Sequence, residues 1–384
     1  MLMNYANEKI KVSADSLANG GAERVACNLA NELSIKKDVE FIAFENTVNY
    51  TLNDKIKLIV NDKKIGNKVV KLMYYPFFAG MQLSANDTVI SNMIRPNLVF
   101  ALLKYLINFR LICIHHSSFR RIKSPLGRLI VKFFYKKADV VVCISVDMLQ
   151  DYNNIMGNTN GVLIHNPHEL SRIEELAKDD DVVNQFKNLI NIEKEKTDYF
   201  VIVGRLIPLK KIETLIDAFE YGVPDKTKVL IIGKGDEAYT KQLKESIKNK
   251  GLNNRIIFLG HMNNPFPLIA KSNGIILCSE SEGFPNILVE SLCLGVPVIA
   301  TDCVSGPREI LCAEGDMPKH GYIKTSYGIL IPVNDPVSLS KAINDITSFR
   351  DKYDKKALRR RVSEFDIKKI VEKYYKIIDT KIPS

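Results

Sequence analysis

Several patterns that mark common protein classes are absent from this chain of 384 residues. No run of about 18 consecutive apolar residues is present, so we expect no transmembrane helix. The seven cysteines include no CxxC pair, which argues against a disulfide framework and for free thiols in a reducing cytoplasm. HExxH, EF-hand and P-loop patterns are missing as well, and the first residues are too polar for a signal peptide. The sequence therefore predicts a cytoplasmic globular protein without a metal site.

Acidic residues are missing from one long stretch, which runs from residue 88 to residue 138. Its 51 residues carry ten basic side chains, as many as the net charge of +10 of the whole chain. Apolar residues such as Phe119, Leu129 and Phe133 are interleaved with them. A basic, amphipathic segment of this kind suits an anionic membrane surface; a solvated helix face backed by the core and a nucleic-acid site are the alternatives. We expect contact with an anionic membrane surface, and no nucleic acid because no homeodomain, zinc-finger or RRM pattern is present.

Short apolar runs alternate with helical patterns along both halves of the chain. The runs lack polar alternation, which indicates strands buried on both faces of a parallel sheet. We expect strands at Lys9–Ala14, Glu40–Phe44, Thr88–Ser91, Leu111–Ile114, Val140–Ile144, Val162–Ile164, Tyr199–Val203, Lys228–Ile232, Arg255–Leu259, Gly274–Cys278, Val298–Thr301 and Gly328–Ile331. Strands that alternate with helices in two series predict α/β architecture with two doubly wound, Rossmann-like domains.

A polar stretch without strands separates the two series and contains runs of charge near residues 179–181 and 193–196. We therefore expect a first domain over residues 1–175, a linker over residues 176–197 and a second domain over residues 198–365. The final helix, over residues 366–384, is a candidate for packing back on the first domain.

Ligands of open α/β sheets bind at the carboxyl ends of the strands, so the residues that follow each run form the candidate site. After the first run, Gly20 and Gly21 open a helix where backbone N–H groups can approach an anion; a plain tight turn is the alternative. His115 and His116 follow the fourth run, and a polar pair at a strand end shifts the interpretation from a structural role towards a site. Gly233 belongs to another glycine turn, for which ordinary turn chemistry is the alternative.

Two basic residues follow the run Tyr199–Val203. Arg205 and Lys210 lie five residues apart in a loop that enters a helix, so they can converge on one anion. The guanidinium grips phosphate oxygens with its fork and the ammonium adds charge. Without a metal, such a pair can neutralise a departing diphosphate. A solvated basic helix start is the alternative.

The most specific signal is the string from Ser279 to Ala300, SESEGFPNILVESLCLGVPVIA. It predicts a strand end, a loop and a short helix with Pro285 in its first turn. Free N–H groups around residues 284–288 can hold an anion, and Glu282 and Glu290 can accept hydrogen bonds from sugar hydroxyls. Glu282 lies in the loop and Glu290 about two turns into the helix, a span of about 12 Å at 1.5 Å per residue, which argues against the catalytic pair of a retaining glycosidase. The alternative is a surface amphipathic helix.

These motifs resemble glycosyltransferase family 4, the retaining nucleotide-sugar glycosyltransferases of GT-B fold. The resemblance rests on GGAER, GRLIPLKK, IIGKGDE, FLGHM and EGFPNILVESLCLGVPVIAT, which occur in that order. It covers nearly the whole chain and is strongest from about residue 198 to about residue 335. It implies a GT-B arrangement, with two Rossmann-like domains across a cleft and the first domain on the acceptor side.

The resemblance also implies roles for individual residues. Arg205 and Lys210 hold the donor diphosphate and balance the charge of the leaving group. Glu282 contacts the transferred sugar, and Glu290 binds the nucleotide ribose. The residues expected to take part in catalysis are Glu282, His116, Arg205 and Lys210.

The remaining contacts to the donor follow from the same resemblance. Gly21 approaches the diphosphate, and His116 lies near the donor sugar, with His115 as the other candidate for that role. The loop at Met262 resembles the one whose backbone reads the base. The other residues expected to bind the donor are Gly233, Gly283, Phe284, Pro285, Asn286, Ile287 and Leu288.

The chain departs from the family pattern at two points. Lys211 stands where glycine usually follows the lysine, and Ser305-Gly306 replaces a double glycine before Glu309. The second change bears on the fit of the donor or the acceptor.

The resemblance implies transfer of a hexose from a nucleotide diphosphate sugar to a sugar hydroxyl, with retention at the anomeric carbon and without a metal or other cofactor. We expect a UDP-linked donor of glucose, galactose, GlcNAc or GalNAc type. The expected acceptor is a lipid-linked saccharide at the inner face of the cell membrane, in the synthesis of O-antigen, capsule or another surface polysaccharide. A GDP-mannose-dependent mannosyltransferase, a GT-B nucleotide-sugar epimerase and a non-catalytic nucleotide or nucleic-acid binder are the alternatives.

Overall fold

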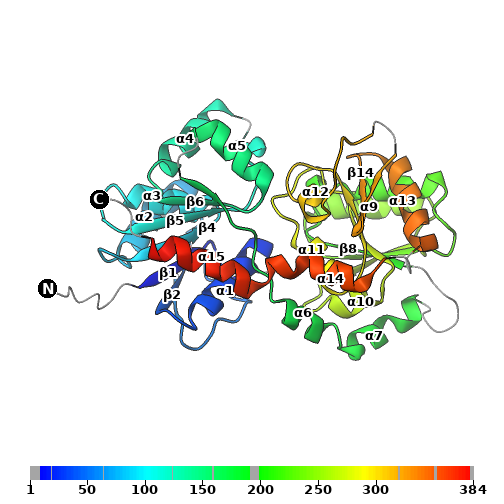
Figure 1. The fold of residues 1–384 in the computed structure, drawn as a ribbon, viewed down its shortest axis with the longest axis horizontal. Helices are drawn as coiled ribbons and strands as arrows, with labels where there is room; N and C mark the ends of the chain where they lie inside the picture. The colour runs from blue at the N-terminus through cyan, green and yellow to red at the C-terminus, as the bar shows by residue number, and fades with distance from the viewer. Residues whose placement is uncertain are drawn as a thin grey trace. The chain divides into compact units, whose positions relative to one another are not determined.

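Residues 9–18, 20–63, 65–122, 124–157, 160–190, 199–318, 321–349 and 353–380 are described by the structure, a computed structural model of the chain. Contacts between Cα atoms divide the chain into two units. Unit 1 contains residues 1–168 and 365–384, and unit 2 contains residues 169–364. Each unit is built on a seven-stranded sheet with helices packed on it (Figure 1).

The sheet of unit 1 is parallel and has the strand order β3-β2-β1-β4-β5-β6-β7. Its strands are β1 (Ile10–Ala14), β2 (Val39–Ala43), β3 (Lys57–Val60), β4 (Thr88–Asn92), β5 (Arg110–His115), β6 (Val140–Cys143) and β7 (Gly161–Leu163). Every residue of β1, β2 and β4 is buried, as expected for central strands covered on both faces. Lys11 is buried among them because its ammonium lies 2.5 Å from Glu40 Oε2.

The helices of unit 1 connect these strands, and the last one comes from the end of the chain. They are α1 (Gly21–Leu33), α2 (Lys68–Gly80), α3 (Ile94–Leu103), the 3-10 helix η1 (Phe119–Arg121), α4 (Pro125–Tyr135), α5 (Val146–Met156) and α15 (Ile367–Asp379). Asp366 caps α15 by accepting from Lys368 N over 3.0 Å. Its buried face, which includes Ile370 and Tyr374, packs against α1.

The sheet of unit 2 has the strand order β10-β9-β8-β11-β12-β14-β13. Its strands are β8 (Tyr199–Val203), β9 (Lys228–Ile232), β10 (Ile256–Gly260), β11 (Gly274–Leu277), β12 (Val298–Thr301), β13 (Ile323–Lys324) and β14 (Gly328–Ile331). All neighbours are parallel except β13, which pairs antiparallel with β14 at the edge. The core includes Phe200, Ile231, Ile276 and Ile299, which come from four neighbouring strands.

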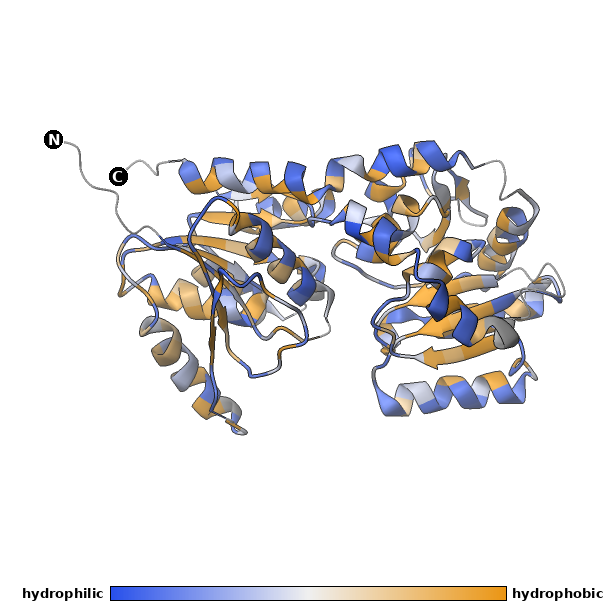
Figure 2. Ribbon diagram, turned by 90° about the horizontal axis from the view of Figure 1, so that it is seen from below, coloured by the Kyte–Doolittle hydropathy of each residue, from blue (hydrophilic) through white to orange (hydrophobic). Residues whose placement is uncertain are grey.

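The helices of unit 2 pack on this sheet and on one another. They are α6 (Leu170–Leu176), α7 (Asp180–Ile190), η2 (Pro208–Lys210), α8 (Ile212–Ala218), η3 (Phe219–Tyr221), α9 (Glu237–Asn249), α10 (Phe266–Lys271), α11 (Asn286–Cys293), α12 (Pro307–Ile310), α13 (Pro336–Phe349) and α14 (Lys355–Val362), with η5 (Ser363–Phe365) at the boundary of the units. The strands of both sheets are hydrophobic, whereas most helices combine hydrophobic and hydrophilic residues (Figure 2). None of the helices described has the length and apolar character that a membrane span needs.

The prediction of two doubly wound, Rossmann-like α/β units is confirmed, and each of the expected strands is present with ends that shift by at most a few residues. Two strands were missed. β3 lies at an edge and none of its residues is buried, and its apolar run, Leu58–Val60, has only three residues, which is short for a strand signal. β13 has only two residues, too few for any period to show.

The stretch expected as a linker, residues 176–197, contains helix α7, and residues 191–198 lie outside the described residues. Residues 169–175 were assigned to the first domain, but they belong to unit 2. There α6 packs on α11, and Cys293 Sγ donates to Leu170 O over 3.5 Å. The final helix joins unit 1 through α1.

Candidate active site

The strand order of unit 2 reverses between β8 and β11, and ligands of open α/β sheets bind outside the carboxyl ends of the strands where this happens. Two loops meet here, residues 204–211 after β8 and residues 278–285 after β11, and we call this end of the sheet the β8/β11 edge. A small pocket at this edge is lined by residues from both sides, which include Val203, Gly204, Arg205, Lys210, Cys278 and Ser279. The charged residues expected in the two loops therefore lie at one end of the sheet.

Lys210 and Glu282 form an ion pair at the β8/β11 edge, with 2.6 Å between Nζ and Oε1. Their side chains are 22% and 14% exposed. Lys210 reaches this position from η2, and the Glu282 N–H donates to Val304 O over 3.2 Å. Arg205 is exposed and lines the same pocket as Lys210. The structure thus brings together three of the residues that the resemblance assigns to the donor.

Lys211, which follows Lys210, adopts a left-handed backbone conformation with φ 48° and ψ 44°. This conformation favours glycine and costs about 1–2 kcal/mol in other residues, which explains why the family usually has glycine here. The lysine side chain makes contacts that glycine lacks, since its Nζ lies 3.5 Å from Glu280 Oε2. The Glu280 N–H also donates to Leu209 O over 2.9 Å, so the loops after β8 and β11 are joined at several points.

The glycine turn after β9 packs directly on the loop after β8. A Cβ atom on Gly233 would lie 1.8 Å from the carbonyl oxygen of Gly204, so no larger residue fits unless the backbone moves. The Gly233 N–H donates to Gly260 O over 2.7 Å and holds the end of β10 beside this turn. Met262 lies two residues further on and is half-buried. Packing accounts for the glycine, and the roles of Gly233 and Met262 in donor binding stay predictions.

Helix α11 begins at Asn286 without a side-chain cap, and the three residues before it, 283–285, are buried. The turn at Ser305 and Gly306 supports this approach, because a Cβ on Gly306 would lie 2.5 Å from Pro285 Cδ. Both turn residues have positive φ, 71° and 94°, which explains the double glycine of the family. An N-terminus without a side-chain cap suits an anion, so the geometry agrees with the expected role of residues 283–288.

Glu290 projects from α11 and is 4% exposed. It is the one buried charged side chain in the described part of unit 2. A fully buried carboxylate is rare in a protein unless it is paired. The contact of Glu290 with a ribose stays a prediction.

Gly21 is the first residue of α1 in unit 1 and is exposed. Gly20, the N-cap residue, offers no side chain to the first turn, and its carbonyl accepts from Tyr50 Oη over 3.2 Å. The start of α1 therefore lacks a side-chain cap, as α11 does. The proposed approach of Gly21 to a diphosphate stays a prediction.

The structure separates the two adjacent histidines. His115 is buried, its ring stacks on Phe119 with 3.9 Å between centroids, and its Nδ1 lies 2.9 Å from Tyr135 Oη. His116 is half-buried, and its Nε2 lies 3.0 Å from Asn92 Oδ1. Burial lowers the pKa of His115 to about 3 and that of His116 to about 4, so both imidazoles are neutral at pH 7. His115 is a core residue, which leaves His116 as the candidate for contact with a ligand.

Neither a reactive thiol nor a group of metal ligands is found at the β8/β11 edge among the described residues. Burial raises the pKa of Cys278, which lines the pocket, and that of Cys303 to about 12, so neither is a thiolate at pH 7. Within the ranges that the structure describes, no three His, Cys, Asp or Glu side chains gather as metal ligands. The expectation of a reaction without a metal stays a prediction.

Sequence reasoning gave no role to several polar residues at these strand ends. Ser279 is fully buried in the pocket wall, and its Oγ makes no hydrogen bond with any described residue. Asn92 holds His116, and its Nδ2 donates to Ser13 O over 3.2 Å. Asp15 and Arg95 follow β1 and β4, and Arg95 Nε lies 3.4 Å from Asp15 Oδ1. Their positions directly after strands are the signal by which they could have been found.

Comparison with known proteins gives the same picture. The family model "Glycosyltransferase Family 4" matches residues 19–172, and "Glycosyl transferases group 1" matches residues 183–364. The chain is 28% identical over 381 residues to N-acetylgalactosamine-N,N'-diacetylbacillosaminyl-diphospho-undecaprenol 4-alpha-N-acetylgalactosaminyltransferase of Campylobacter jejuni, with 94% of this chain and 97% of the relative covered. It is 24% identical to the GalNAc-alpha-(1->4)-GalNAc-alpha-(1->3)-diNAcBac-PP-undecaprenol alpha-1,4-N-acetyl-D-galactosaminyltransferase of the same organism, with 96% and 98% covered.

Among solved structures, Anabaena HepE in complex with UDP-glucose superposes with a TM-score of 0.77 at 18% identity, covering 96% of this chain and 99% of HepE. This likeness concerns the fold. The two family models follow one another along the chain, and each covers most of one of its two α/β units. The chain is therefore a glycosyltransferase of family 4 with the GT-B fold.

Proposed function

We propose that this glycosyltransferase transfers a hexose or an N-acetylhexosamine from a UDP-linked donor to a lipid-linked saccharide, with retention of the anomeric configuration, in the synthesis of a surface polysaccharide. The observation that carries the proposal is the β8/β11 edge, where Arg205, Lys210 and Glu282 meet. Two cations at one pocket suit a diphosphate, and a carboxylate beside them suits sugar hydroxyls. The names of the two Campylobacter relatives give diphospho-undecaprenol-linked saccharides as acceptors, and HepE was crystallised with UDP-glucose, which supports both halves of the proposal.

Departure of the nucleotide is the step that the two cations assist. As the bond between the sugar and the diphosphate breaks, negative charge develops on the leaving phosphate. The Arg205 fork and the Lys210 ammonium stabilise that charge, and the N-terminus of α11 adds its dipole. The loss of one such preorganised group in other enzymes costs about 100-fold to 1000-fold in rate.

Donor binding requires an exchange at Lys210. Its ammonium is paired with Glu282 in the structure, so the diphosphate has to take the place of the carboxylate. Glu282, once released, is free to accept hydrogen bonds from the hydroxyls of the transferred sugar. One ion pair thus keeps both groups oriented until the donor arrives.

His116 is proposed to contact the donor sugar as a neutral imidazole. Its Nε2 is engaged with Asn92 Oδ1, which fixes the orientation of the ring. Because burial lowers its pKa to about 4, His116 is neutral, and with Nε2 donating to Asn92 its Nδ1 can accept a hydrogen bond without introducing charge near the reacting carbon.

Membrane contact is proposed for α2 and α4 of unit 1. Large apolar side chains on these helices are exposed: Leu72, Met73 and Phe77 on α2, and Leu126, Leu129 and Phe133 on α4. α3 packs against both helices and so links them into one surface, which we call the apolar helix face. Arg128, Lys132 and Lys136 are exposed on and beside α4. Apolar side chains edged by cations suit an anionic bilayer that presents a lipid-linked acceptor.

The nucleotide is tested by thermal unfolding of the full chain with UDP and with GDP. A ligand present at 100 times its Kd adds about 2.7 kcal/mol, enough to raise the Tm visibly. We expect a shift with UDP that Glu290→Gln abolishes, while Glu237→Gln, at the exposed start of α9, leaves it unchanged. A shift with GDP alone would assign the protein to the mannosyltransferases, and no shift with either nucleotide would refute the proposal.

Transfer is tested with UDP-linked glucose, galactose, GlcNAc and GalNAc and with diphospho-undecaprenol-linked mono- and disaccharides. We expect a product whose length grows by one sugar and whose new bond has the anomeric configuration of the donor. Conversion of the nucleotide sugar itself without any acceptor would identify an epimerase instead.

Membrane contact is tested by sedimentation with vesicles of phosphatidylglycerol and phosphatidylcholine. We expect binding that the triple variant Arg128→Glu, Lys132→Glu, Lys136→Glu abolishes while the UDP-induced shift in Tm persists. The matched control reverses Lys241, Lys244 and Lys248 on α9 of unit 2. Equal vesicle binding by both triple variants would remove the argument for the apolar helix face.

A further inference from the structure

The sheet of unit 1 has its own reversal of strand order, between β1 and β4. Asp15 follows β1 directly, and Arg95 lies in the first turn of α3 just after β4. The two strands are neighbours, with Ile10 opposite Thr88. Asp15 and Arg95 therefore flank the position at which open α/β sheets bind their ligands, and none of the roles assigned so far uses them.

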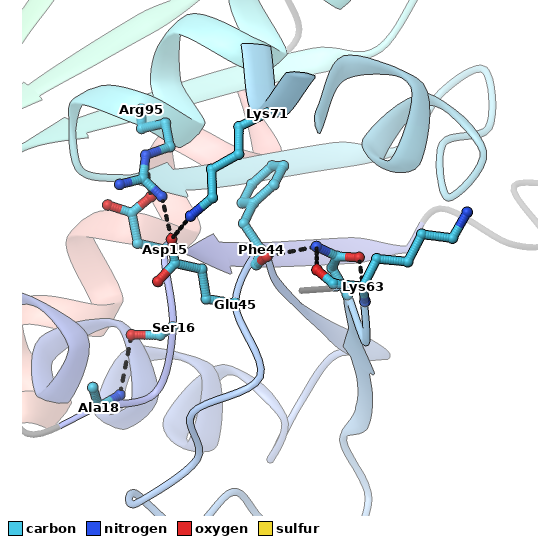
Figure 3. Close-up of polar contacts among 9 residues, drawn as sticks. Asp15, Ser16, Ala18, Phe44, Glu45, Lys63, Lys71 and Arg95 are labelled. Atoms are coloured by element: carbon cyan, nitrogen blue, oxygen red, sulfur yellow. Dashed lines mark hydrogen bonds and ion pairs between the residues drawn. The ribbon is translucent and has the colours of Figure 1, made fainter. Parts of the chain in front are cut away.

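Four charged side chains, two from the loops after β1 and β2 and two from helices α2 and α3, gather at this position (Figure 3). Arg95 Nη1 lies 2.8 Å from Glu45 Oε1, and Lys71 Nζ lies 3.0 Å from the same oxygen. Arg95 Nε lies 3.4 Å from Asp15 Oδ1. We call these four residues the β1/β4 cluster. The loops that carry its acids are fixed to each other, since the Glu45 N–H donates to Asp15 O over 2.9 Å.

Asp15 is the member of the cluster with a buried carboxylate oxygen that lacks a hydrogen bond among the described residues. Its Oδ1 is buried and accepts no hydrogen bond from any described residue. Burial raises the pKa of the Asp15 carboxyl to about 6, although Arg95 acts to lower it. Burial also acts on Glu45, but hydrogen bonds from Arg95 and Lys71 outweigh it and lower the pKa of that residue.

Stability does not account for this arrangement. Ion pairs at a protein surface contribute about 0–1 kcal/mol, and a buried carboxylate oxygen without a donor is a cost. Such a group is expected where a ligand supplies the missing hydrogen bond. Asp15 offers an acceptor and Arg95 offers donors, and a sugar hydroxyl can both donate and accept.

We propose that Asp15 and Arg95 bind the terminal sugar of the acceptor and so determine which saccharide is extended. The inference rests on the proposed function, because it identifies the ligand as the acceptor of the transfer. The neighbourhood suits a lipid-linked acceptor. Glu45 connects Arg95 to Lys71, and Lys71 lies on α2 next to Leu72 and Met73 of the apolar helix face. Asn92, the partner of His116, ends β4 three residues before Arg95.

Sugar binding by the full chain is measured by saturation-transfer NMR with the methyl α-glycosides of glucose, galactose, GlcNAc and GalNAc. Asp15→Asn and Arg95→Gln are compared with Asp62→Asn, which removes an exposed carboxylate that follows β3 at the same end of the same sheet. We expect the glycoside that binds wild-type protein to lose affinity about tenfold or more in the first two variants and to keep it in the third. We expect the KM for a lipid-linked acceptor to rise in Asp15→Asn and Arg95→Gln but not in Asp62→Asn. The UDP-induced shift in Tm stays unchanged in all three variants.

Equal glycoside binding by wild-type protein, Asp15→Asn and Arg95→Gln would overturn the inference, and so would the absence of glycoside binding by the wild-type protein. If Arg95→Gln fails to fold, Asp15→Asn decides alone, because Arg95 keeps its ion pair with Glu45 in that variant. Glycoside binding that depends on Asp15, in a protein that neither responds to a nucleotide nor transfers a sugar, would refute the proposed function and leave a sugar site in unit 1.

Discussion

Lys210 and Glu282 neutralise each other across the β8/β11 edge, at 2.6 Å between Nζ and Oε1. The resemblance assigns one of them to the diphosphate and the other to the sugar, so the residues that meet the two halves of the donor are partners before it binds. From the proposed roles we expect the donor to compete with a group of the protein itself. We then expect an affinity for the nucleotide lower than the cations alone would give, with the Glu282 carboxylate held in reach of the sugar.

The variant Glu282→Gln separates the competition for Lys210 from the contact of Glu282 with the sugar. Without a carboxylate beside it, Lys210 is free for the diphosphate, and we expect the Kd for UDP to fall about fivefold, the equivalent of roughly 1 kcal/mol. The transfer rate falls about 100-fold because the contact with the sugar is weakened. Isothermal titration with UDP and initial rates of transfer measure the two quantities. Lys210→Gln removes the other partner, and we expect it to weaken both UDP binding and transfer. If Glu282→Gln also weakens UDP binding, the proposed competition is contradicted.

Lys211→Gly tests the left-handed residue after η2. Glycine relieves a conformation that costs an L-residue about 1–2 kcal/mol, and it loses part of this gain through the greater freedom of the unfolded chain. We expect the free energy of unfolding to rise by about 0–1 kcal/mol, with transfer activity preserved. Urea denaturation provides the measurement. A fall of more than about 1 kcal/mol would show that the contact between Lys211 and Glu280 outweighs the backbone cost.

Gly233→Ala tests the close packing of the turn after β9 on the loop after β8. The new Cβ would lie 1.8 Å from the carbonyl oxygen of Gly204, a backbone atom that cannot rotate away. We expect a loss of more than about 2 kcal/mol in the free energy of unfolding. Gly251→Ala is the matched control, because Gly251 also has positive φ but nothing lies within 4 Å of its Cβ position. Similar losses in both variants would mean that the backbone angle, and not the contact, requires glycine at position 233.

The buried histidines predict how stability depends on pH. Burial lowers the pKa of His115 and that of His168 to about 3, below the value of about 6.5 for an unfolded chain. The unfolded state therefore binds more protons below pH 6.5. Stability is complete above that pH and falls as the pH drops towards 3, by up to about 1.4 kcal/mol per pH unit for each histidine. Asp15 has the opposite effect, because its pKa is raised to about 6 in the folded protein. Between the pKa of an unfolded aspartate and pH 6, its contribution to stability falls as the pH rises.

Guanidinium unfolding of wild-type protein, His115→Asn and His168→Gln between pH 5 and pH 7.5 isolates the histidine contribution. Each substitution should lower the slope of the unfolding free energy against pH by about the contribution of one buried histidine. Slopes that do not change would place the acid sensitivity elsewhere in the chain.

Most residues of the β8/β11 edge could be predicted from the sequence because they lie in two short, contiguous strings. Once β8 and β11 are identified as buried strands, the residues after them must share one end of the sheet, and Lys210 meets Glu282 there. The β1/β4 cluster could not be found in this way. Asp15 and Arg95 are 80 positions apart, and neither stands in a recognisable string. Their proximity follows only from the pairing of β1 with β4.

The choice between His115 and His116 shows a second limit. Both follow the same apolar run, but His115 is the last residue of β5 and is buried with it, whereas His116 lies beyond the strand. Which of the two is buried depends on Phe119 and Tyr135, the partners of His115, which come from η1 and α4. Their positions follow from tertiary packing, which no local pattern specifies.

The return of α15 to unit 1 has a consequence for synthesis. Residues 169–364 form unit 2 without interruption, whereas unit 1 starts with β1 and is completed by a helix that follows the last residue of unit 2. His168 and Phe365 mark the two crossings, and the His168 N–H donates to Phe365 O over 3.0 Å. During synthesis on the ribosome, α1 lacks its packing partner α15 until all of unit 2 has been made. The unit that the ribosome begins first is thus the one that can be completed only after the other has left the exit tunnel.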